Sequence, residues 1–171
     1  MKTENEITYA IINAAICVHK ALGPGLLEST YASCLRMELK DRNIRFLSEL
    51  ELPVIYRETV IDKSYRIDLL VEDQIVVELK SVETVSDLHH AQLLTYLKLS
   101  KHKVGLLINF NVPVLRDGIS RKINTLKTLW ISVNSVSNFP TLIQTTYFWS
   151  MEKKKKVMLG LKLPTDPRWV N

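Results

Sequence analysis

The chain has 171 residues, of which 46% are hydrophobic and 24% are charged. This composition suits one packed domain and excludes disorder over the whole length. No apolar run approaches the roughly 18–20 residues that cross a bilayer, and no secretory signal is visible. Two cysteines are too few for a disulfide scaffold or a four-thiolate metal site, so we expect a reducing, cytoplasmic location.

The positive charge of the chain is concentrated at its C-terminal end. Residues 1–124 contain 16 Lys and Arg and 16 Asp and Glu residues, whereas residues 125–171 contain 7 basic and 2 acidic residues. The formal net charge of +5 therefore belongs to the second segment. A basic pI usually suggests nucleic acid as a partner, but here it does not describe the main domain.

Hydrophobic periodicity predicts two helices, three strands, a helix and a strand, over residues 4–22, about 27–41, 45–56, 59–71, 75–80, 86–100 and 104–110. Gly23 and Pro24 mark the end of the first helix. Pro53 places its strand at an edge or a bulge, and Ser86 or Asp87 is expected to cap the last helix. The order predicts an α/β or α+β domain with a mixed sheet.

The chemistry-bearing residues lie in the predicted hairpin over residues 65–80, whose turn is centred on Asp73. This turn pairs Val71 with Ile75, Leu70 with Val76, and Leu69 with Val77. It also places Asp68 opposite Glu78, and directly opposed side chains point to the same face. Lys80 shares the face of Glu78 because strand side chains alternate. Two carboxylates and one ammonium group are thereby expected on an otherwise apolar strand pair.

Two opposed carboxylates repel each other and are costly to bury, so we expect a compensating group. Mg²⁺ and Mn²⁺ prefer oxygen ligands, and Lys80 could reach a water or a phosphate oxygen beside such an ion. Metal, carboxylates and lysine together suit the activation of water against a phosphodiester. The plainer interpretation is a structural Asp–Lys or Glu–Lys pair on a half-exposed sheet.

Several stretches of the chain resemble a known family. The pattern Asp68…Glu78-Leu79-Lys80 resembles the signature of the PD-(D/E)XK nuclease superfamily, although Ile67 stands where the superfamily's name suggests proline. Residues 25–31 read G-x-x-E-x-x-Y, and the chain resembles the GxxExxY family, a bacterial and archaeal branch of that superfamily. Further matches in the expected order lie at residues 18–25, 89–97 and 104–113.

This resemblance implies a restriction-endonuclease-like core of αβββαβ order over residues 1–124, with a mixed central sheet flanked by helices. The implied catalytic residues are Asp68, Glu78 and Lys80. The implied ligands of Mg²⁺ or Mn²⁺ are Glu28, Asp68, Glu78 and the backbone carbonyl of Leu79. Lys80 would orient the attacking water and stabilise the developing charge.

The resemblance also places Gln92 over the site, while helical spacing puts Tyr96 and His89 on the same side of that helix. Tyr31 shares a helix face with Glu28. Plainer interpretations remain: the two tyrosines as core aromatics with solvated hydroxyls, Glu28 as a helix-start acid favoured by the helix dipole, and His89 as an ordinary first-turn residue. Arg66 would face Lys80 across the hairpin, where it could contact phosphate or neutralise Glu78.

The expected function is a metal-dependent nuclease acting on nucleic acid, with DNA favoured over RNA. The alternative is a non-catalytic module on the nuclease fold that binds nucleic acid or protein, since fold alone does not fix function. The intact Asp–Glu–Lys set argues against this alternative. The absence of a basic excess in residues 1–124 argues mildly for it.

The remaining residues, 125–171, do not continue the family pattern. Four consecutive lysines at 153–156, close to Trp149, could contact phosphate. Residues 158–171 resemble the opening of diiron tRNA hydroxylases, but none of that family's metal ligands is present. We therefore predict that residues 125–171 are a poorly ordered extension, fused or frame-shifted, to which no activity is assigned.

Overall fold

The computed structural model describes residues 2–57 and 59–125. The chain divides into a unit from Met1 to Ile131 and a unit from Ser132 to Asn171, and the structure described below belongs to the first. The extension predicted over residues 125–171 lies, apart from Thr125, outside the described residues. Within the described residues, no helix is both long enough and apolar enough to cross a membrane.

The described elements are three α-helices, five strands and one 3₁₀ helix: α1 (Glu4–Leu22), α2 (Glu28–Asp41), β1 (Phe46–Tyr56), β2 (Thr59–Val71), β3 (Ile75–Lys80), α3 (Asp87–Ser100), β4 (Val104–Asn109), η1 (Leu115–Gly118) and β5 (Ile119–Ile123). The predicted order of helices and strands up to β4 is confirmed. The sequence analysis missed η1 and β5. Only the two terminal residues of β5 are apolar, and the strand is half-exposed, so it carries little hydrophobic signal.

The five strands form one mixed sheet in the order β1-β2-β3-β4-β5. Only β3 and β4 are parallel; the other neighbours are antiparallel. The predicted hairpin register is confirmed in three pairs, Leu69 with Val77, Leu70 with Val76 and Val71 with Ile75. The predicted α/β fold with a mixed sheet is therefore confirmed, and β3 is its central strand.

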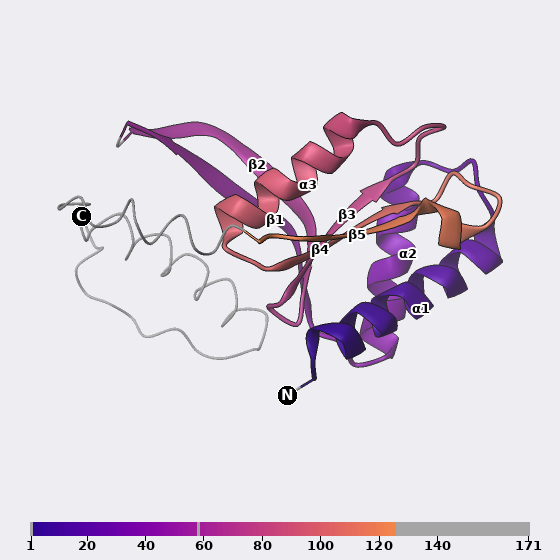
Figure 1. Cartoon of the computed structure of the whole chain (residues 1–171). Coiled ribbons are helices and arrows are strands. Elements are labelled where there is room, and N and C mark those ends of the chain that lie inside the picture. The colour runs from indigo at the N-terminus through magenta and orange to yellow at the C-terminus, as the bar shows by residue number, and fades with distance from the viewer. Residues whose placement is uncertain (1, 58, 126–171) are drawn as a thin grey trace, which may run out of the picture. The chain divides into compact units, whose positions relative to one another are not determined.

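Helices α1 and α2 cover one face of the sheet, and α3 lies on the other (Figure 1). The core between α1, α2 and the sheet contains residues at alternate positions of β3, namely Ile75, Val77 and Leu79. Alternation therefore directs Glu78 and Lys80 toward the α3 side. The sequence predicts this division, because it places the two charged residues on one face of a strand that is otherwise apolar.

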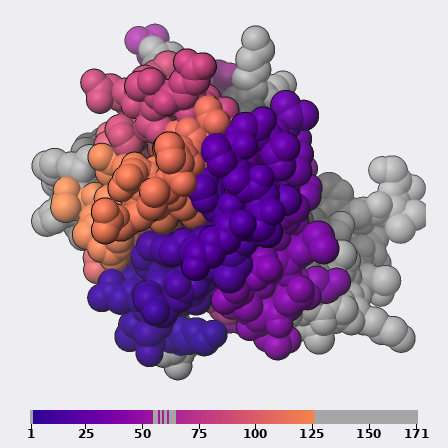
Figure 2. All heavy atoms as spheres, turned by 90° about the vertical axis from the view of Figure 1, so that its right-hand side faces the viewer, coloured from indigo at the N-terminus to yellow at the C-terminus, as the bar shows by residue number. Residues whose placement is uncertain are grey.

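The segment after β4 lies against α1, as Figure 2 shows from the side of the first two helices. His19 of α1 is buried, and its Nε2 lies 2.8 Å from the carbonyl oxygen of Val112. His19 is therefore a packed helix residue that connects α1 to this segment.

Strand β1 is an edge strand, and its register against β2 shifts between Leu52 and Val54. The residue between them is Pro53, which has no N–H to donate to a ladder. The prediction that Pro53 marks an edge or a bulge is confirmed on both counts.

Strands β1 and β2 also change the side on which they are buried. Leu69 belongs to the core under α1 and α2, whereas Tyr65, four residues earlier on the same strand, contacts Tyr96 of α3. Unbroken alternation would keep both residues on one face. The change occurs where Glu49 of β1 has a φ of 53°, in the left-handed region that non-glycine residues rarely adopt. Asp68 lies on β2 at the same level, between the pairs formed by Leu69 and Ile67.

Candidate active site

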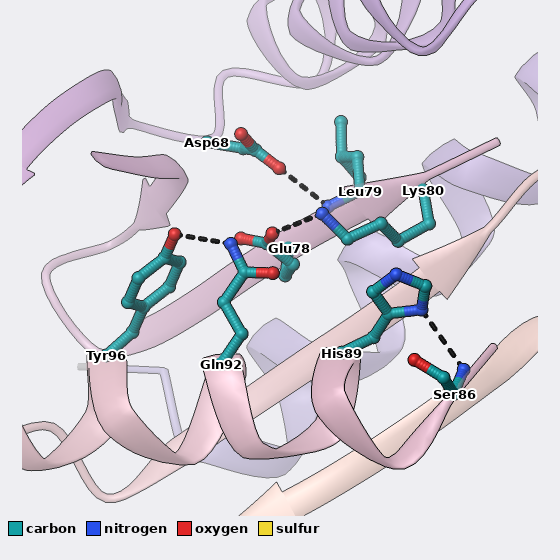
Figure 3. A network of polar contacts seen from close by, with 8 residues as sticks. All are labelled: Asp68, Glu78, Leu79, Lys80, Ser86, His89, Gln92 and Tyr96. Atoms are coloured by element: carbon teal, nitrogen blue, oxygen red, sulfur yellow. Dashed lines mark hydrogen bonds and ion pairs between the residues drawn. The ribbon is translucent and has the colours of Figure 1, made fainter. Parts of the chain in front are cut away.

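The hairpin ladder ends one pair earlier than predicted. Its last pair is Leu69 with Val77, and Asp68 is not paired through the backbone with Glu78. Instead the Asp68 carboxylate accepts a hydrogen bond of 2.7 Å from the backbone N–H of Leu79 (Figure 3). The prediction that Asp68 lies directly opposite Glu78 is therefore wrong. Strand β2 changes the side that it buries at Asp68, and the Asp68 carboxylate accepts the hydrogen bond that a backbone carbonyl of β2 would accept in a regular ladder. The two acids remain neighbours, since the charge of Asp68 raises the pKa of Glu78.

Glu78 carries the most unusual environment among the described carboxylates. Its residue is only 2% exposed. One carboxylate oxygen, Oε1, lies 2.6 Å from Nζ of Lys80, whereas the other, Oε2, is buried without a hydrogen-bond partner. Burial, and next the charge of Asp68, raise the pKa of Glu78 to about 7 against the opposing effect of Lys80. A buried carboxylate oxygen without a partner is costly, so this position calls for a compensating group.

Asp68 and Lys80 are perturbed by the same environment. Burial raises the pKa of Asp68, the hydrogen bond from Leu79 opposes this, and the charge of Glu28 adds to it. Burial lowers the pKa of Lys80, but the hydrogen bond and charge of Glu78 outweigh burial and raise it above its ordinary value. Lys80 therefore stays cationic at neutral pH and is the positive partner of the cluster.

The G-x-x-E-x-x-Y stretch positions the start of α2. Gly25 has a φ of 97°, which side-chain-bearing residues rarely adopt. The Tyr31 hydroxyl donates to the Gly23 carbonyl at 2.6 Å and accepts from the Leu26 N–H at 3.1 Å. Ser81, directly after β3, donates to the Leu26 carbonyl at 2.6 Å. The loop before α2 is thus tied both to its own helix and to the strand that carries the polar cluster.

Tyr31 itself belongs to the core. It is fully buried and stacks on Phe110 with ring centroids 4.5 Å apart. Its hydroxyl bonds backbone groups of the loop and is not solvated, so the plainer interpretation of this tyrosine holds for the ring but not for the hydroxyl. Among its described contacts, none is with the side chains of Asp68, Glu78 or Lys80.

Glu28 is the first residue of α2, where the helix dipole favours an acid. Its charge raises the pKa of both Asp68 and Glu78, so it lies within electrostatic reach of them. Across residues 2–57 and 59–125, however, no three His, Cys, Asp or Glu side chains lie close enough to hold a metal ion together. The role of Glu28 as a ligand stays a prediction.

Helix α3 presents three of the predicted side chains toward β3. Gln92, His89 and Tyr96 extend from one side of the helix toward Glu78 and Lys80 (Figure 3). The Gln92 amide donates to the Tyr96 hydroxyl at 2.6 Å, and His89 Nδ1 accepts from the Ser86 N–H at 3.1 Å. Burial raises the pKa of Tyr96, and the charges of Glu78 and Asp68 raise it further. The predicted shared helix face is therefore present.

Arg66 does not occupy its expected place. Its ladder partner is Glu51 of β1, and its side chain is exposed. Because the β2–β3 ladder ends at Leu69, the predicted opposition of Arg66 and Lys80 is wrong. Arg66 is also not among the charges that shift the pKa of Lys80 or of Glu78.

Asn109, at the end of β4, is a site-supporting residue that the sequence analysis missed. It is 2% exposed and lies beside Lys80 in the parallel register. Its side-chain oxygen accepts from the Val82 N–H at 3.0 Å, and its side-chain nitrogen donates to the Val82 carbonyl at 2.8 Å. It thereby holds the chain directly after Lys80. The only indication of this role in the sequence is that Asn109 is a polar residue at the end of an otherwise apolar strand.

The donor set fits a hard divalent cation. Its members are carboxylate oxygens, and the buried oxygen of Glu78 without a partner supplies the structural observation that such an ion would satisfy. Asp68 lies close by, and the backbone carbonyl of Leu79 follows directly after Glu78 in the strand. These groups are suited to holding a cation next to the ammonium group of Lys80.

Comparison with known proteins gives one family. A family model described as the PD-(D/E)XK nuclease superfamily matches residues 5–122. A solved structure entitled "Crystal structure of SSO0001" is 22% identical, covers 80% of this chain and 73% of that chain, and has a TM-score of 0.42. No curated protein matches.

Proposed function

Because this chain belongs to the PD-(D/E)XK nuclease superfamily, we propose that it is a Mg²⁺- or Mn²⁺-dependent nuclease that hydrolyses phosphodiester bonds in nucleic acid, with DNA favoured over RNA. Members of the superfamily typically use divalent metals. The observation that carries the proposal is the carboxylate of Glu78, which is nearly fully buried with one oxygen bound to Lys80 and the other without a partner.

Within the superfamily, the G-x-x-E-x-x-Y stretch at residues 25–31 supports assignment to the GxxExxY branch. This stretch has a structural role: Gly25 adopts the positive φ that the turn requires, and Tyr31 fixes the loop that leads to Glu28. We assign the nuclease domain to residues 1–124, and the extension over residues 125–171 has no role in the proposal.

In the proposed site, Asp68, Glu78 and the Leu79 carbonyl would hold the cation, with Glu28 as a further acid at the helix start. When bound, the cation polarises the phosphate and lowers the pKa of a coordinated water. Ligation requires Glu78 in its charged form, so a cation at Oε2 would supply the interaction that burial denies it.

In this proposal Lys80 acts on the attacking water and on the phosphate. Its ammonium group is already held beside Glu78 at 2.6 Å, and its raised pKa keeps it protonated. We assign to it the orientation of the attacking water and the stabilisation of negative charge on the phosphate, which such fixed donors provide in a site shielded from water. Gln92 and His89, on the facing side of α3, are assigned to positioning the substrate.

The test is cleavage of single- and double-stranded DNA and RNA by the full chain with Mg²⁺, Mn²⁺ or EDTA. Lys80→Ala and Asp68→Asn should each lower the rate by about 10²–10³-fold, as expected when a preorganised group is removed from a site. Lys98→Ala, which removes an exposed lysine of α3, is the matched control and should keep full activity.

Cleavage that persists in EDTA or in Lys80→Ala would contradict the assigned site. No cleavage by folded wild-type protein on any substrate would instead favour the non-catalytic alternative. Metal binding by that protein, measured calorimetrically with Mn²⁺, would then show whether the carboxylates still hold a cation.

A further inference from the structure

An aromatic ring with an open side lies at the edge of the polar cluster. Tyr65 precedes Asp68 by three residues on β2, and the tyrosine is 45% exposed. Its ring meets that of Tyr96 edge to face, with centroids 5.8 Å apart and an interplanar angle of 63°. Packing thus holds the ring in place while nearly half of the residue stays accessible to solvent.

Tyr96 connects this ring to the candidate active site. Its hydroxyl accepts the hydrogen bond from Gln92, and it lies within electrostatic reach of Glu78, Asp68 and Lys80. The position of Tyr65 depends on the change of facing at Glu49, since unbroken alternation would turn the ring to the α1 and α2 side. The unusual backbone at this level therefore places an aromatic surface against Tyr96, which is itself within electrostatic reach of the residues assigned to phosphate hydrolysis.

The charge of the domain indicates what such a surface could bind. Residues 1–124 have no net charge, so general attraction to phosphates supplies little affinity. Nucleobases stack on aromatic rings with little dependence on sequence, and this stacking is a main source of affinity for single strands. In a duplex both faces of a base are covered by its neighbours, and only an unpaired base can stack on a protein ring.

We propose that Tyr65 is a stacking platform for an unpaired nucleobase adjacent to the phosphate at the Asp68–Glu78–Lys80 cluster, and that the substrate is single-stranded nucleic acid. The location of the phosphate rests on the proposed function. Tyr65 acts through ground-state binding, so its loss raises KM and leaves kcat nearly unchanged.

The test measures binding of fluorescein-labelled oligo(dT) and of a duplex of equal length to the full chain by fluorescence anisotropy. Ca²⁺ replaces Mg²⁺, and a gel confirms that the probe stays intact. Tyr65→Leu keeps an apolar group against Tyr96 but removes the ring, and Tyr65→Phe keeps the ring. Tyr9→Leu is the matched control, because Tyr9 is 70% exposed on α1, on the other side of the sheet.

Tyr65→Leu should weaken binding of the single strand about 5- to 150-fold. Tyr65→Phe should stay within about twofold of wild type, and Tyr9→Leu should bind like wild type, because π-stacking needs the ring at position 65 and not the hydroxyl. Binding of the duplex should be weaker than that of the single strand and insensitive to Tyr65. Urea unfolding of each variant shows whether it is folded.

A second readout reports stacking directly. Oligo(dT) carrying one 2-aminopurine should lose fluorescence on binding to wild type and to Tyr65→Phe, and should keep it with Tyr65→Leu. A merely structural role of Tyr65 would not produce this pattern, and the wild-type measurement is informative even if the leucine variant unfolds.

The inference and the proposed function fail in different ways. Equal binding of oligo(dT) by wild type and folded Tyr65→Leu, or no quenching by wild type, would overturn the inference even if the protein cleaves nucleic acid. Quenching that depends on Tyr65 in a protein without cleavage activity would support the stacking platform and would count against the nuclease.

Discussion

The buried carboxyl of Glu78 makes the stability of the domain depend on pH. Its pKa is about 7 in the folded protein, against an ordinary value of 4.5. Between these values the folded state binds more protons than the unfolded state, so the free energy of unfolding falls as pH rises. The favourable contribution is complete below pH 4.5 and is lost as pH rises through about 7. Its loss between pH 5 and pH 8 is roughly 2.5 kcal/mol.

Glu78→Gln keeps the shape of the side chain but cannot ionise. In EDTA, the variant should therefore gain roughly 2.5 kcal/mol relative to wild type between pH 5 and pH 8. Urea unfolding at several pH values measures this difference. Glu72→Gln is the control: hydrogen bonds from Arg45 outweigh burial and lower the pKa of Glu72, so its titration lies below this window.

Adding the cation supplies the second half of the test. A divalent ion that binds only the folded protein at about 100 times its Kd stabilises it by about 2.7 kcal/mol. Mg²⁺ or Mn²⁺ should therefore offset the loss at pH 8 in wild type and do so less in Glu78→Gln. A difference between the two proteins that is flat with pH in EDTA would refute the buried-carboxyl reasoning. A pH-dependent difference in unfolding free energy that is unchanged by added Mg²⁺ or Mn²⁺ would refute the metal site.

Three further variants test the support of the site, each by urea unfolding. Asn109→Ala should cost about 2–3 kcal/mol, because both backbone groups of Val82 lose their partner; an unchanged midpoint would contradict this anchoring role. Tyr31→Phe should cost about 1–2 kcal/mol, because the loop before α2 loses two hydrogen bonds while the ring stack remains. Gly105→Ala should cost about 1–3 kcal/mol, because its Cβ would lie 2.8 Å from Cδ1 of Leu93; a stabilised variant would show that the side chain can move aside.

Local patterns were sufficient to predict most of the fold. Helix α1 ends at Gly23 and helix α3 begins after Ser86, as the sequence indicates, and the hairpin register follows from a turn centred on Asp73. These features depend on a few neighbouring residues, so a single sequence contains them. Strand β5 escaped prediction because an edge strand that is half-exposed needs few apolar residues.

The candidate site was less predictable because it depends on where regular structure stops. Simple alternation predicted Asp68 opposite Glu78 and Arg66 opposite Lys80. The regular pattern stops near Glu49: Asp68 bonds the Leu79 N–H, and the β2–β3 ladder ends at Leu69, before it reaches Arg66. A positive φ at a glutamate has no sequence signal of its own, because glutamate adopts this conformation only when the surrounding structure imposes it.

The change of facing at Glu49 also limits how the chain can vary in length. Between Glu49 and the turn that joins β1 to β2, the pair of Leu52 and Tyr65 faces α3. On the other side of Glu49, toward the start of β1, Leu69 faces α1 and α2. One residue inserted into either strand between these points would turn every following side chain to the opposite face. Insertions or deletions should therefore be tolerated at the tip of the β1–β2 hairpin, where both strands change together, and excluded near Glu49 and Asp68. In homologous chains, the spacing from Tyr65 to Asp68 should vary far less than the length of the hairpin beyond it.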